Sequence, residues 1–279
     1  MSTSPQSAIA RNIEIHDEIA KQYDARHGEI FNPVEQARLR VALASALSLV
    51  QTAASRRTAL DVGCGSGNLS RHLLDLGLDV IAADVSQGFL DLVGNRFAGR
   101  SVKTIRLNGS DLSNVASASC DMVATYSVLH HVPDYLALVA EMARVCAPGG
   151  VLFLDHEASD GYWAGDPLYD AFRKEALCFD WGKYLAWKNY VGRVRRIGNP
   201  RYSMEGDIHV WPDDHIEWAK IHELLTCLGF ECVVSEDYLL SRKLYRPEVY
   251  ERYRGRCSDM RNQAYRRRPA GPEVRRCAD

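Results

Sequence analysis

The chain has 279 residues, of which 46% are hydrophobic and 25% are charged, and its formal net charge is -2. These values argue against a disordered or fibrous chain, and the length allows one large core with insertions or a small cap. No apolar run approaches the roughly 18 residues that cross a bilayer, and the start lacks the apolar stretch of a secretory signal, which predicts a cytoplasmic protein.

The spacing of the cysteines indicates their redox state, and the distribution of charge along the chain indicates possible partners. The eight cysteines are scattered without CxxC pairs, which is typical of reduced packing residues. Residues 242–279 hold twelve Lys or Arg against five Asp or Glu. One interpretation is a polyanionic partner. A solvated basic helix with a frayed tail is favoured, because the arginines are interleaved with acids, Pro and Gly.

Two helices are predicted before the first strand, on either side of the Asn32-Pro33 break. The apolar positions that recur every fourth residue are Ile15, Ile19 and Tyr23, then Leu39, Leu43 and Leu47. Short β-branched runs then alternate with helical patterns. These runs are Thr58–Val62, Val80–Ala83, Lys103–Leu107, Met122–Tyr126 and Val151–Asp155. The alternation predicts an α/β fold, with a parallel sheet and helices on both faces.

The alternation stops in a segment rich in Tyr and Trp, which indicates an inserted cap. It resumes with a helix at Pro212–Leu228 and a strand at Phe230–Leu240, and a basic helix near Pro247–Tyr265 closes the fold. The predicted divisions are an N-terminal helical lid (1–50), a ligand-binding core (51–157), the cap (158–211), the C-terminal part of the core (212–265) and a flexible tail (266–279).

A glycine turn comes after the first predicted strand, in the segment TALDVGCGSGNLSRHLL. Gly63, Gly65 and Gly67 permit a sharp turn and close approach of a ligand, and the N–H groups at the helix start attract an anion. The spacing GxGxG departs from the dinucleotide fingerprint. Asp84 ends the next strand, where a carboxylate accepts both hydroxyls of a ribose. Together, the turn and the acid predict a nucleoside site.

These residues resemble the class I S-adenosylmethionine-dependent methyltransferases, in particular the small-molecule group that includes the ubiquinone and menaquinone methylating enzymes. The segments that carry the resemblance are, in order, LDVGCGSG, AADVS, GSDL, SCDMVATYSVLHHVPD and CAPGGVLFL. The resemblance implies a Rossmann-like fold with a central, mostly parallel, seven-stranded sheet. It also implies S-adenosylmethionine as cofactor and S-adenosylhomocysteine as product.

The resemblance further implies a set of cofactor contacts. This set is Tyr23, Asp61, Gly63, Cys64, Gly65, Gly67, Asp84, Val85, Ser110, Asp111, Leu112 and Tyr126. In this scheme Asp84 holds the ribose, Asp111 accepts from the adenine amino group, and Asp61 lies near the methionine amino group. The glycines pass under the methionine part. Either of the acids Asp84 and Asp111 is alternatively a strand-end cap.

The remaining implied contacts have alternatives of their own. Val85 and Leu112 would flank the adenine plane, although Leu112 is equally explained as core. Tyr126 would offer its carbonyl to the methionine amino group. Tyr23 is either a lid tyrosine or a core aromatic. Cys64 is a small residue that the turn allows, without chemistry of its own.

Methyl transfer from a sulfonium is an in-line displacement, so positioning supplies much of the catalysis, and a hydroxyl acceptor must also lose a proton. His130 and His131, after the fourth strand, are candidate bases, as is His156 at the end of the fifth. Packing of the helix start is the alternative for the first two. A metal at Asp155, His156 or Glu157 is a disfavoured alternative, and no required metal is predicted.

The acceptor site is expected between the cap and the N-terminal segment. The predicted substrate-binding residues are His27, Phe31, Tyr162, Trp163, Trp181 and Tyr184. Aromatic rings stack on flat acceptors or shield a sulfonium from water. An ordinary subdomain core is the alternative for the cap, and a structural helix-turn-helix is the alternative for the N-terminal segment.

Three functions compete. A methyltransferase (EC 2.1.1.-) acting on a small-molecule acceptor, foremost at oxygen, is favoured. An RNA or protein methyltransferase rests on the basic C-terminal segment alone, and no RNA-binding motif supports it, so nucleic acid is disfavoured as a partner. An enzyme that uses S-adenosylmethionine in another reaction is the third. No membrane partner is expected, and a homodimer stays open by analogy with similar enzymes.

Overall fold

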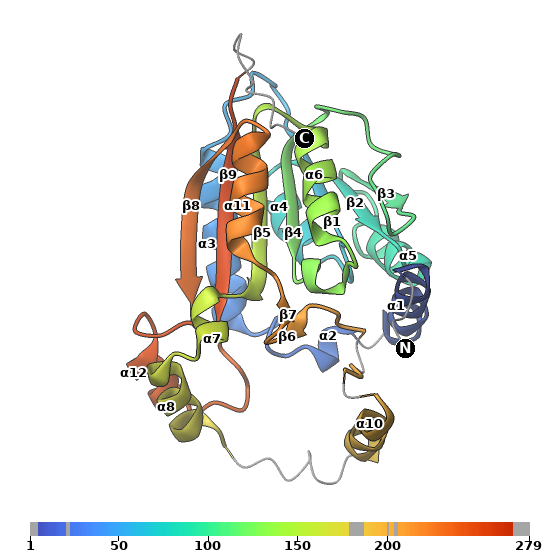
Figure 1. Cartoon of the computed structure of the whole chain (residues 1–279). Coiled ribbons are helices and arrows are strands. Elements are labelled where there is room, and N and C mark those ends of the chain that lie inside the picture. Colours follow the sequence, from blue (N-terminus) through green and yellow to red (C-terminus); the bar gives the residue numbers. More distant parts are fainter. Residues whose placement is uncertain (1–4, 21–22, 179–186, 200, 204–205, 270–279) are drawn as a thin grey trace.

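A seven-stranded sheet forms the centre of the computed structural model, which describes residues 5–20, 23–178, 187–199, 201–203 and 206–269 (Figure 1). The strand order is β3-β2-β1-β4-β5-β9-β8, and β9 alone runs antiparallel to its neighbours. The strands are β1 (Thr58–Val62), β2 (Asp79–Asp84), β3 (Val102–Arg106), β4 (Cys120–Tyr126), β5 (Cys146–Ala158), β8 (Phe230–Tyr238) and β9 (Met260–Arg267). The predicted fold class is confirmed.

Helices cover both faces of the sheet, as Figure 1 shows with α6 and α11 in front and α3 and α4 behind. One core joins the sheet to α6 (Tyr135–Val145) and α11 (Trp218–Cys227). The second joins it to α3 (Pro33–Ser48), α4 (Asn68–Asp75) and α5 (Gln87–Arg96). Because both faces are covered, all seven residues of β4 are buried.

The order of the strands fixes where a ligand can bind. From β1 the chain moves outward through β2 and β3, and then returns to the other side of β1 to form β4. Open α/β sheets bind ligands beyond the carboxyl ends of the strands at such a reversal. The glycine turn after β1 and the segment after β4 both lie at this edge.

In the described residues before β1 there are three helices, whereas two were predicted. They are α1 (Pro5–Ile19), the short α2 (Tyr23–Arg26) and α3. The Asn32-Pro33 break begins α3, because the Asn32 side chain accepts a hydrogen bond from the Glu35 N–H at 3.0 Å and Pro33 occupies the first turn. The α1 helix packs against α5 at the edge of the sheet.

The inserted segment contains α7 (Asp160–Ala164), α8 (Pro167–Ala176) and α10 (Trp187–Gly198). Tyr169 and Phe172 of α8 pack with Tyr245 and with α12 (Pro247–Tyr253) in a third hydrophobic core. For these aromatics, the alternative of an ordinary subdomain core is therefore the observed one.

Two predicted helices differ in the structure. The helix expected from Pro212 begins only at Trp218, because residues 210–215 pair as a hairpin of β6 (Val210–Trp211) and β7 (Asp214–His215). The basic helix expected over Pro247–Tyr265 ends with α12 at Tyr253. The next element along the chain is β9, which also includes the first two residues of the predicted tail, Arg266 and Arg267.

The arginines of β9 conceal a central strand in the sequence pattern. Arg261 pairs with Asp160 and Asp237, and Arg266 pairs with Glu231. The acids of β8 therefore pair with two of the twelve basic residues in the segment that suggested a polyanionic partner. None of the seven cysteines in the described part of the chain forms a disulfide. Among the described helices, none has the length and apolarity to span a membrane.

Candidate active site

A cleft opens at the carboxyl edge of the sheet, where β1, β2 and β4 end. Its floor is the glycine turn after β1, and side chains of α1, α2 and α5 border it. The predicted residues Tyr23, Asp61, Gly63, Cys64, Gly65, Asp84, Val85, Ser110, Asp111, Tyr126, Phe31 and His131 all line this cleft. Most of the predicted site is therefore brought together in one place.

The three glycines of the turn adopt left-handed backbone conformations, with φ of +70° at Gly63, +48° at Gly65 and +89° at Gly67. A Cβ at Gly63 would lie 2.5 Å from Val128, and one at Gly67 would lie 2.7 Å from Phe97. A Cβ at Gly65 would meet nothing within 4 Å. A side chain at Gly63 or Gly67 would therefore clash with its neighbours, whereas Gly65 faces open space. Gly67 does not line the cleft.

Asp84 connects the end of β2 to the glycine turn. Its carboxylate accepts hydrogen bonds from the Gly65 N–H and the Ser86 N–H, each at 2.9 Å. Burial raises the pKa of this carboxyl above its usual value. The side chain thus caps the strand end and still lines the cleft. Because each carboxylate oxygen can accept more than one hydrogen bond, the cap and the predicted ribose contact are compatible.

Asp61 is a buried acid without a cation. Its side chain is 1% exposed, and its one described partner is the Ser70 hydroxyl, which donates to Oδ2 at 2.6 Å. Burial raises the pKa of this carboxyl to about 7. No Lys or Arg of the described residues forms an ion pair with it. A bound ammonium at this end of the cleft would favour the ionised carboxylate.

Several buried polar atoms in the wall of the cleft have no hydrogen-bond partner among the described residues. Within the described ranges, four such buried atoms have no hydrogen bond: Asn12 Oδ1, Ser66 Oγ, Asn68 Nδ2 and His131 Nδ1. A buried polar atom without a partner costs about 1–3 kcal/mol. Their gathering in one cleft fits a polar ligand that supplies the missing hydrogen bonds.

The predicted adenine contacts are only partly brought together. Asp111 lines the cleft, and its Oδ1 accepts hydrogen bonds from the Ser113 N–H and the Asn108 side chain, each at 2.9 Å. The hydrogen bond with Ser113 is the main reason that the pKa of Asp111 is lowered. Leu112 is fully buried in the sheet core, and in its place Leu107 borders the cleft.

Aromatic rings form the roof. Tyr23 of α2 lies edge to face with Phe89 at 5.2 Å between ring centroids and with Phe31 at 6.4 Å. The His27 ring is tilted against Tyr23 with 4.2 Å between centroids, and it forms a hydrogen bond with Glu29, but it does not line the cleft. Asp17 of α1 accepts from the Gly88 N–H at 3.1 Å, which fastens the roof to α5.

A single turn of 3-10 helix, η2 (Leu129–His131), comes after β4 and carries two predicted bases. Glu157 of β5 accepts from the Leu129 N–H and from His130 Nδ1, each at 2.8 Å. His131 lines the cleft and His130 does not. Burial lowers the pKa of His131 well below its usual value, so this imidazole is neutral at physiological pH.

The third predicted base, His156, lies outside the cleft. Its backbone is left-handed, with φ of +66°, at a bulge in the pairing of β5 with β9. The bulge interrupts strand alternation, so His156 stacks on Tyr126 at 4.5 Å and contacts the Tyr238 hydroxyl at 3.3 Å. Asp155 is turned to the same side of β5, whereas Glu157 reaches η2.

Asp155 belongs to a closed cluster of charges behind Tyr126. Arg38 of α3 donates to Asp155 Oδ2 at 2.9 Å and to Glu35 Oε2 at 2.9 Å, and its guanidinium lies over the Tyr238 ring. Burial raises the pKa of both acids. This cation is internal to the fold, and the sequence pattern did not indicate it, because α3 and β5 are far apart in the chain.

Two of the predicted aromatic contacts of the cap, Tyr162 and Trp163, lie in the described residues, and neither lines the cleft. Trp163 stacks on His215 at 4.8 Å between centroids, and Tyr162 is 36% exposed. Trp181 and Tyr184 lie outside the described residues. Cleft residues that the sequence did not predict include Asn12, His16 and Ser66, for which the helical pattern and the glycine turn gave no individual signal.

The fold and the cleft define the class: an open α/β protein with a cleft at the carboxyl edge of its sheet. A family described as a methyltransferase domain matches residues 60–154. The chain is 34% identical over 107 residues to the ubiquinone biosynthesis O-methyltransferase of Methylococcus capsulatus, a match that covers 37% of this chain and 44% of that enzyme. The chain thus spans less than half of this curated relative.

Two solved structures share the fold at low sequence identity. The S-adenosylmethionine-dependent methyltransferase from Mesorhizobium loti has 18% identity and a TM-score of 0.52, with 80% of this chain and 96% of that one covered. The magnesium protoporphyrin IX methyltransferase from Synechocystis PCC 6803, with bound S-adenosylmethionine, has 14% identity and a TM-score of 0.54, with 95% and 98% covered. Residues 60–154 of the chain thus match a methyltransferase domain, and the chain shares the fold of these two solved structures.

Proposed function

We propose that the protein transfers the methyl group of S-adenosylmethionine to a hydroxyl oxygen of a small-molecule acceptor. The observation that carries the proposal is the pairing of Asp84 and Asp61 in one cleft: one acid suits a ribose, and the other lacks a cation. The match to an O-methyltransferase over the core supports oxygen as the acceptor atom.

The chain's own residues bind and orient the cofactor in this proposal. Asp84 accepts the ribose hydroxyls, and Asp61 receives the methionine ammonium through Oδ1, since Oδ2 is engaged by Ser70. The N–H groups of the glycine turn face the methionine carboxylate at the start of α4. When bound, the cofactor supplies a methyl group activated by a positive sulfur.

The acceptor is placed on the far side of the cleft, beside η2. His131 is the one predicted base that lines the cleft. The acceptor hydroxyl would pass its proton to His131 or to water, and the bound cofactor would supply a methyl group to the acceptor oxygen, with the electron pair of the broken carbon–sulfur bond kept by sulfur. Holding the two reactants in line contributes about 7–11 kcal/mol. The roof of Tyr23 and Phe31 would exclude water from this arrangement.

Titration calorimetry tests the cofactor assignment. We expect native protein to bind S-adenosylmethionine and S-adenosylhomocysteine in the micromolar range, and Asp84→Ala to weaken both at least tenfold, about 1.4 kcal/mol. Asp91→Ala, which alters an exposed acid of α5, is the matched control and should bind as the native chain does. Absence of binding by folded native protein would overturn the proposal.

A second assay addresses the acceptor atom. Native protein is incubated with S-adenosylmethionine and panels of phenols, catechols and amines, and S-adenosylhomocysteine formation and methylated products are detected by mass spectrometry. Products methylated at hydroxyl oxygen would support the proposal. Turnover confined to amines would contradict the assignment to oxygen while leaving the cofactor assignment intact.

A further inference from the structure

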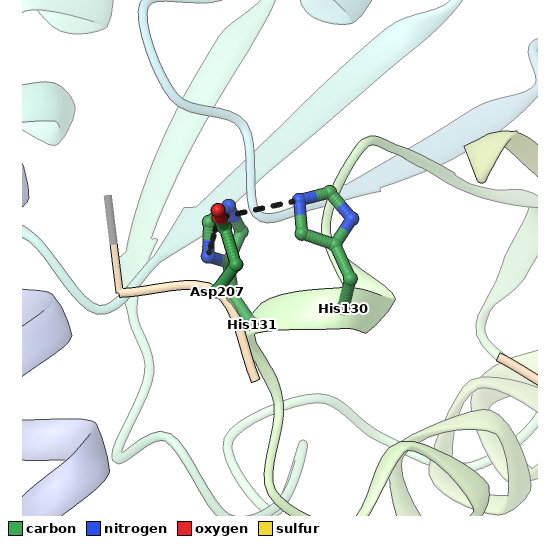
Figure 2. A group of neighbouring side chains, drawn as sticks. All are labelled: His130, His131 and Asp207. Atoms are coloured by element: carbon green, nitrogen blue, oxygen red, sulfur yellow. Dashed lines mark ion pairs between the residues drawn. The ribbon is translucent and has the colours of Figure 1, made fainter. Parts of the chain in front are cut away.

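Three side chains that can bind a metal converge beside the acceptor side of the cleft: His130 and His131 of η2, and Asp207 of the segment before β6 (Figure 2). Asp207 Oδ1 lies 3.4 Å from His131 Nδ1 and 3.9 Å from His130 Nε2. All three atoms lie within 4.8 Å of one another. The three groups come from parts of the chain about 75 residues apart, so the cluster is a product of the fold.

These separations are close to those of ligands around one ion. Two atoms each about 2.1 Å from a metal, at tetrahedral or octahedral angles, lie roughly 3.0–3.4 Å apart. Asp207 and His131 already meet this spacing, and the His130 ring would need to move closer to both. All three side chains are 16–22% exposed, so an ion can reach them from solvent.

The cluster has the outer hydrogen bonds that metal ligands require. Nδ1 of His130 lies 2.8 Å from a Glu157 carboxylate oxygen, and Nε2 of the same ring lies 3.9 Å from Asp207 Oδ1. The Ser203 hydroxyl donates to Oδ2 of Asp207 at 2.7 Å, so that Oδ1 faces the histidines. A carboxylate behind a ligating histidine is the usual arrangement in metal sites.

One ligand atom makes no hydrogen bond of normal geometry to the described residues. This atom, His131 Nδ1, is buried 3.4 Å from Asp207 Oδ1, and the ring also interacts with the Gly206 backbone. The backbone around it is held in place: the His130 carbonyl accepts from the Ile208 N–H at 2.8 Å, and the His131 carbonyl accepts from Asn12 Nδ2 at 2.9 Å. The ligands are therefore positioned, and an ion would satisfy the orphaned nitrogen.

We propose that His130, His131 and Asp207 bind one divalent first-row transition-metal ion, with Zn²⁺, Co²⁺ or Fe²⁺ as the matching class. Two imidazole nitrogens and one carboxylate form the ligand set that these ions favour, and three protein ligands leave positions open for water or substrate. The sequence predicted no required metal, because Asp207 lies more than 70 residues after the histidines.

The role of the ion rests on the proposed function. His131 belongs to both the metal cluster and the cleft wall, so the ion would lie next to the acceptor. A positive charge there lowers the pKa of an acceptor hydroxyl and assists its deprotonation. This would serve in place of a protein base, because His131, the one predicted base that lines the cleft, would then be a ligand of the ion.

Metal binding to the full chain is measured first, without cofactor or acceptor. Chelator-treated protein is titrated with Zn²⁺ by calorimetry and with Co²⁺ by visible absorption. We expect one ion per chain at this site, and at least tenfold weaker binding in Asp207→Asn and in His130→Gln. The controls Asp213→Asn and His222→Gln alter exposed residues and should bind as the native chain does. Thermal unfolding confirms that each variant is folded.

The outcomes separate the two proposals. Failure of folded native protein to bind either ion, or equal affinity in both ligand variants, would overturn the metal site whatever the enzyme does. Metal binding without any S-adenosylmethionine binding would uphold the site and remove the proposed function. If both bind, methyl transfer should fall at least tenfold on chelation and recover with metal in the native chain. In Asp207→Asn added metal should not restore it, although cofactor affinity stays native.

Discussion

Asp155 and Asp61 are buried acids on two strands of one sheet, and they differ in where their positive partner comes from. Asp155 shares Arg38 with Glu35, so its counter-ion is part of the fold. Asp61 has a hydroxyl and no described cation, and it lines the cleft. A buried acid that is complete within the protein indicates structure, whereas one that lacks its cation indicates a ligand.

The largest effect is expected from Arg38→Ala. Removing the shared cation leaves Glu35 and Asp155 buried without a positive partner, so unfolding free energy should fall by about 3–5 kcal/mol at pH 8. Urea denaturation measures the change. Arg40→Ala, on the exposed side of α3, is the matched control and should shift stability by less than about 0.5 kcal/mol. A loss below about 1 kcal/mol in Arg38→Ala would show that the cluster is not the structural one.

Asp61→Asn should weaken cofactor binding without reducing the stability of the fold. The amide can still accept from Ser70 and carries no charge to bury, so the variant should be at least as stable as native protein at pH 8. Its affinity for S-adenosylmethionine should fall at least tenfold, because the ammonium loses its counter-charge. Paired denaturation and calorimetry measure both quantities. A variant that loses stability and keeps affinity would reverse the comparison.

The pH dependence of cofactor affinity sharpens the same point. The pKa of Asp61 is raised to about 7 in the folded protein, so burial of this carboxylate progressively reduces stability as pH rises from about 4 to about 7. A bound ammonium favours the ionised form, so affinity should rise between pH 6 and pH 8, by up to about tenfold per unit below the pKa. In Asp61→Asn this rise should vanish. An equal slope in both proteins would assign it to another group.

The smallest effect is expected from Asp17→Ala in the roof. This removes the acceptor for the Gly88 N–H and the Ser86 hydroxyl at the start of α5, a contribution of about 1 kcal/mol. Cofactor affinity should fall several-fold, and amide exchange in α1 should quicken, while the core of the sheet is unaffected. Glu14→Ala, on the exposed side of α1, is the control. Unchanged amide exchange in α1 would show that Asp17 does not order the roof, so a change in cofactor affinity would need another explanation.

The sequence could predict the residues on the proposed cofactor side of the cleft because they lie close together in the chain. The glycine turn, Asp61 and Asp84 lie within 24 residues, and the turn and both acids can be located directly from the strand pattern. The closed cluster depends on Arg38 meeting Asp155, 117 residues away, which no local pattern reports. Asp207 and Glu157 join the histidines for the same reason.

Two features that the sequence analysis did not predict have physical causes. The β9 strand carries arginines whose charge is balanced by Asp237 and Glu231 of β8, so its polarity conceals a strand at the interior of the sheet. The bulge at His156 changes which side of β5 its neighbours face, so simple alternation did not place them. Both depend on partners that only the assembled sheet supplies.

The position of β9 has a consequence for the order of folding. This last described strand separates β5 from β8, and β8 has no other strand neighbour in the described sheet. During synthesis β5 therefore presents an open edge, and β8 has no strand to pair with, until residues 260–267 have emerged. If translation paused before that point, two strand edges would be exposed to other chains. Addition of β9 to the sheet would therefore protect the nascent protein from aggregation.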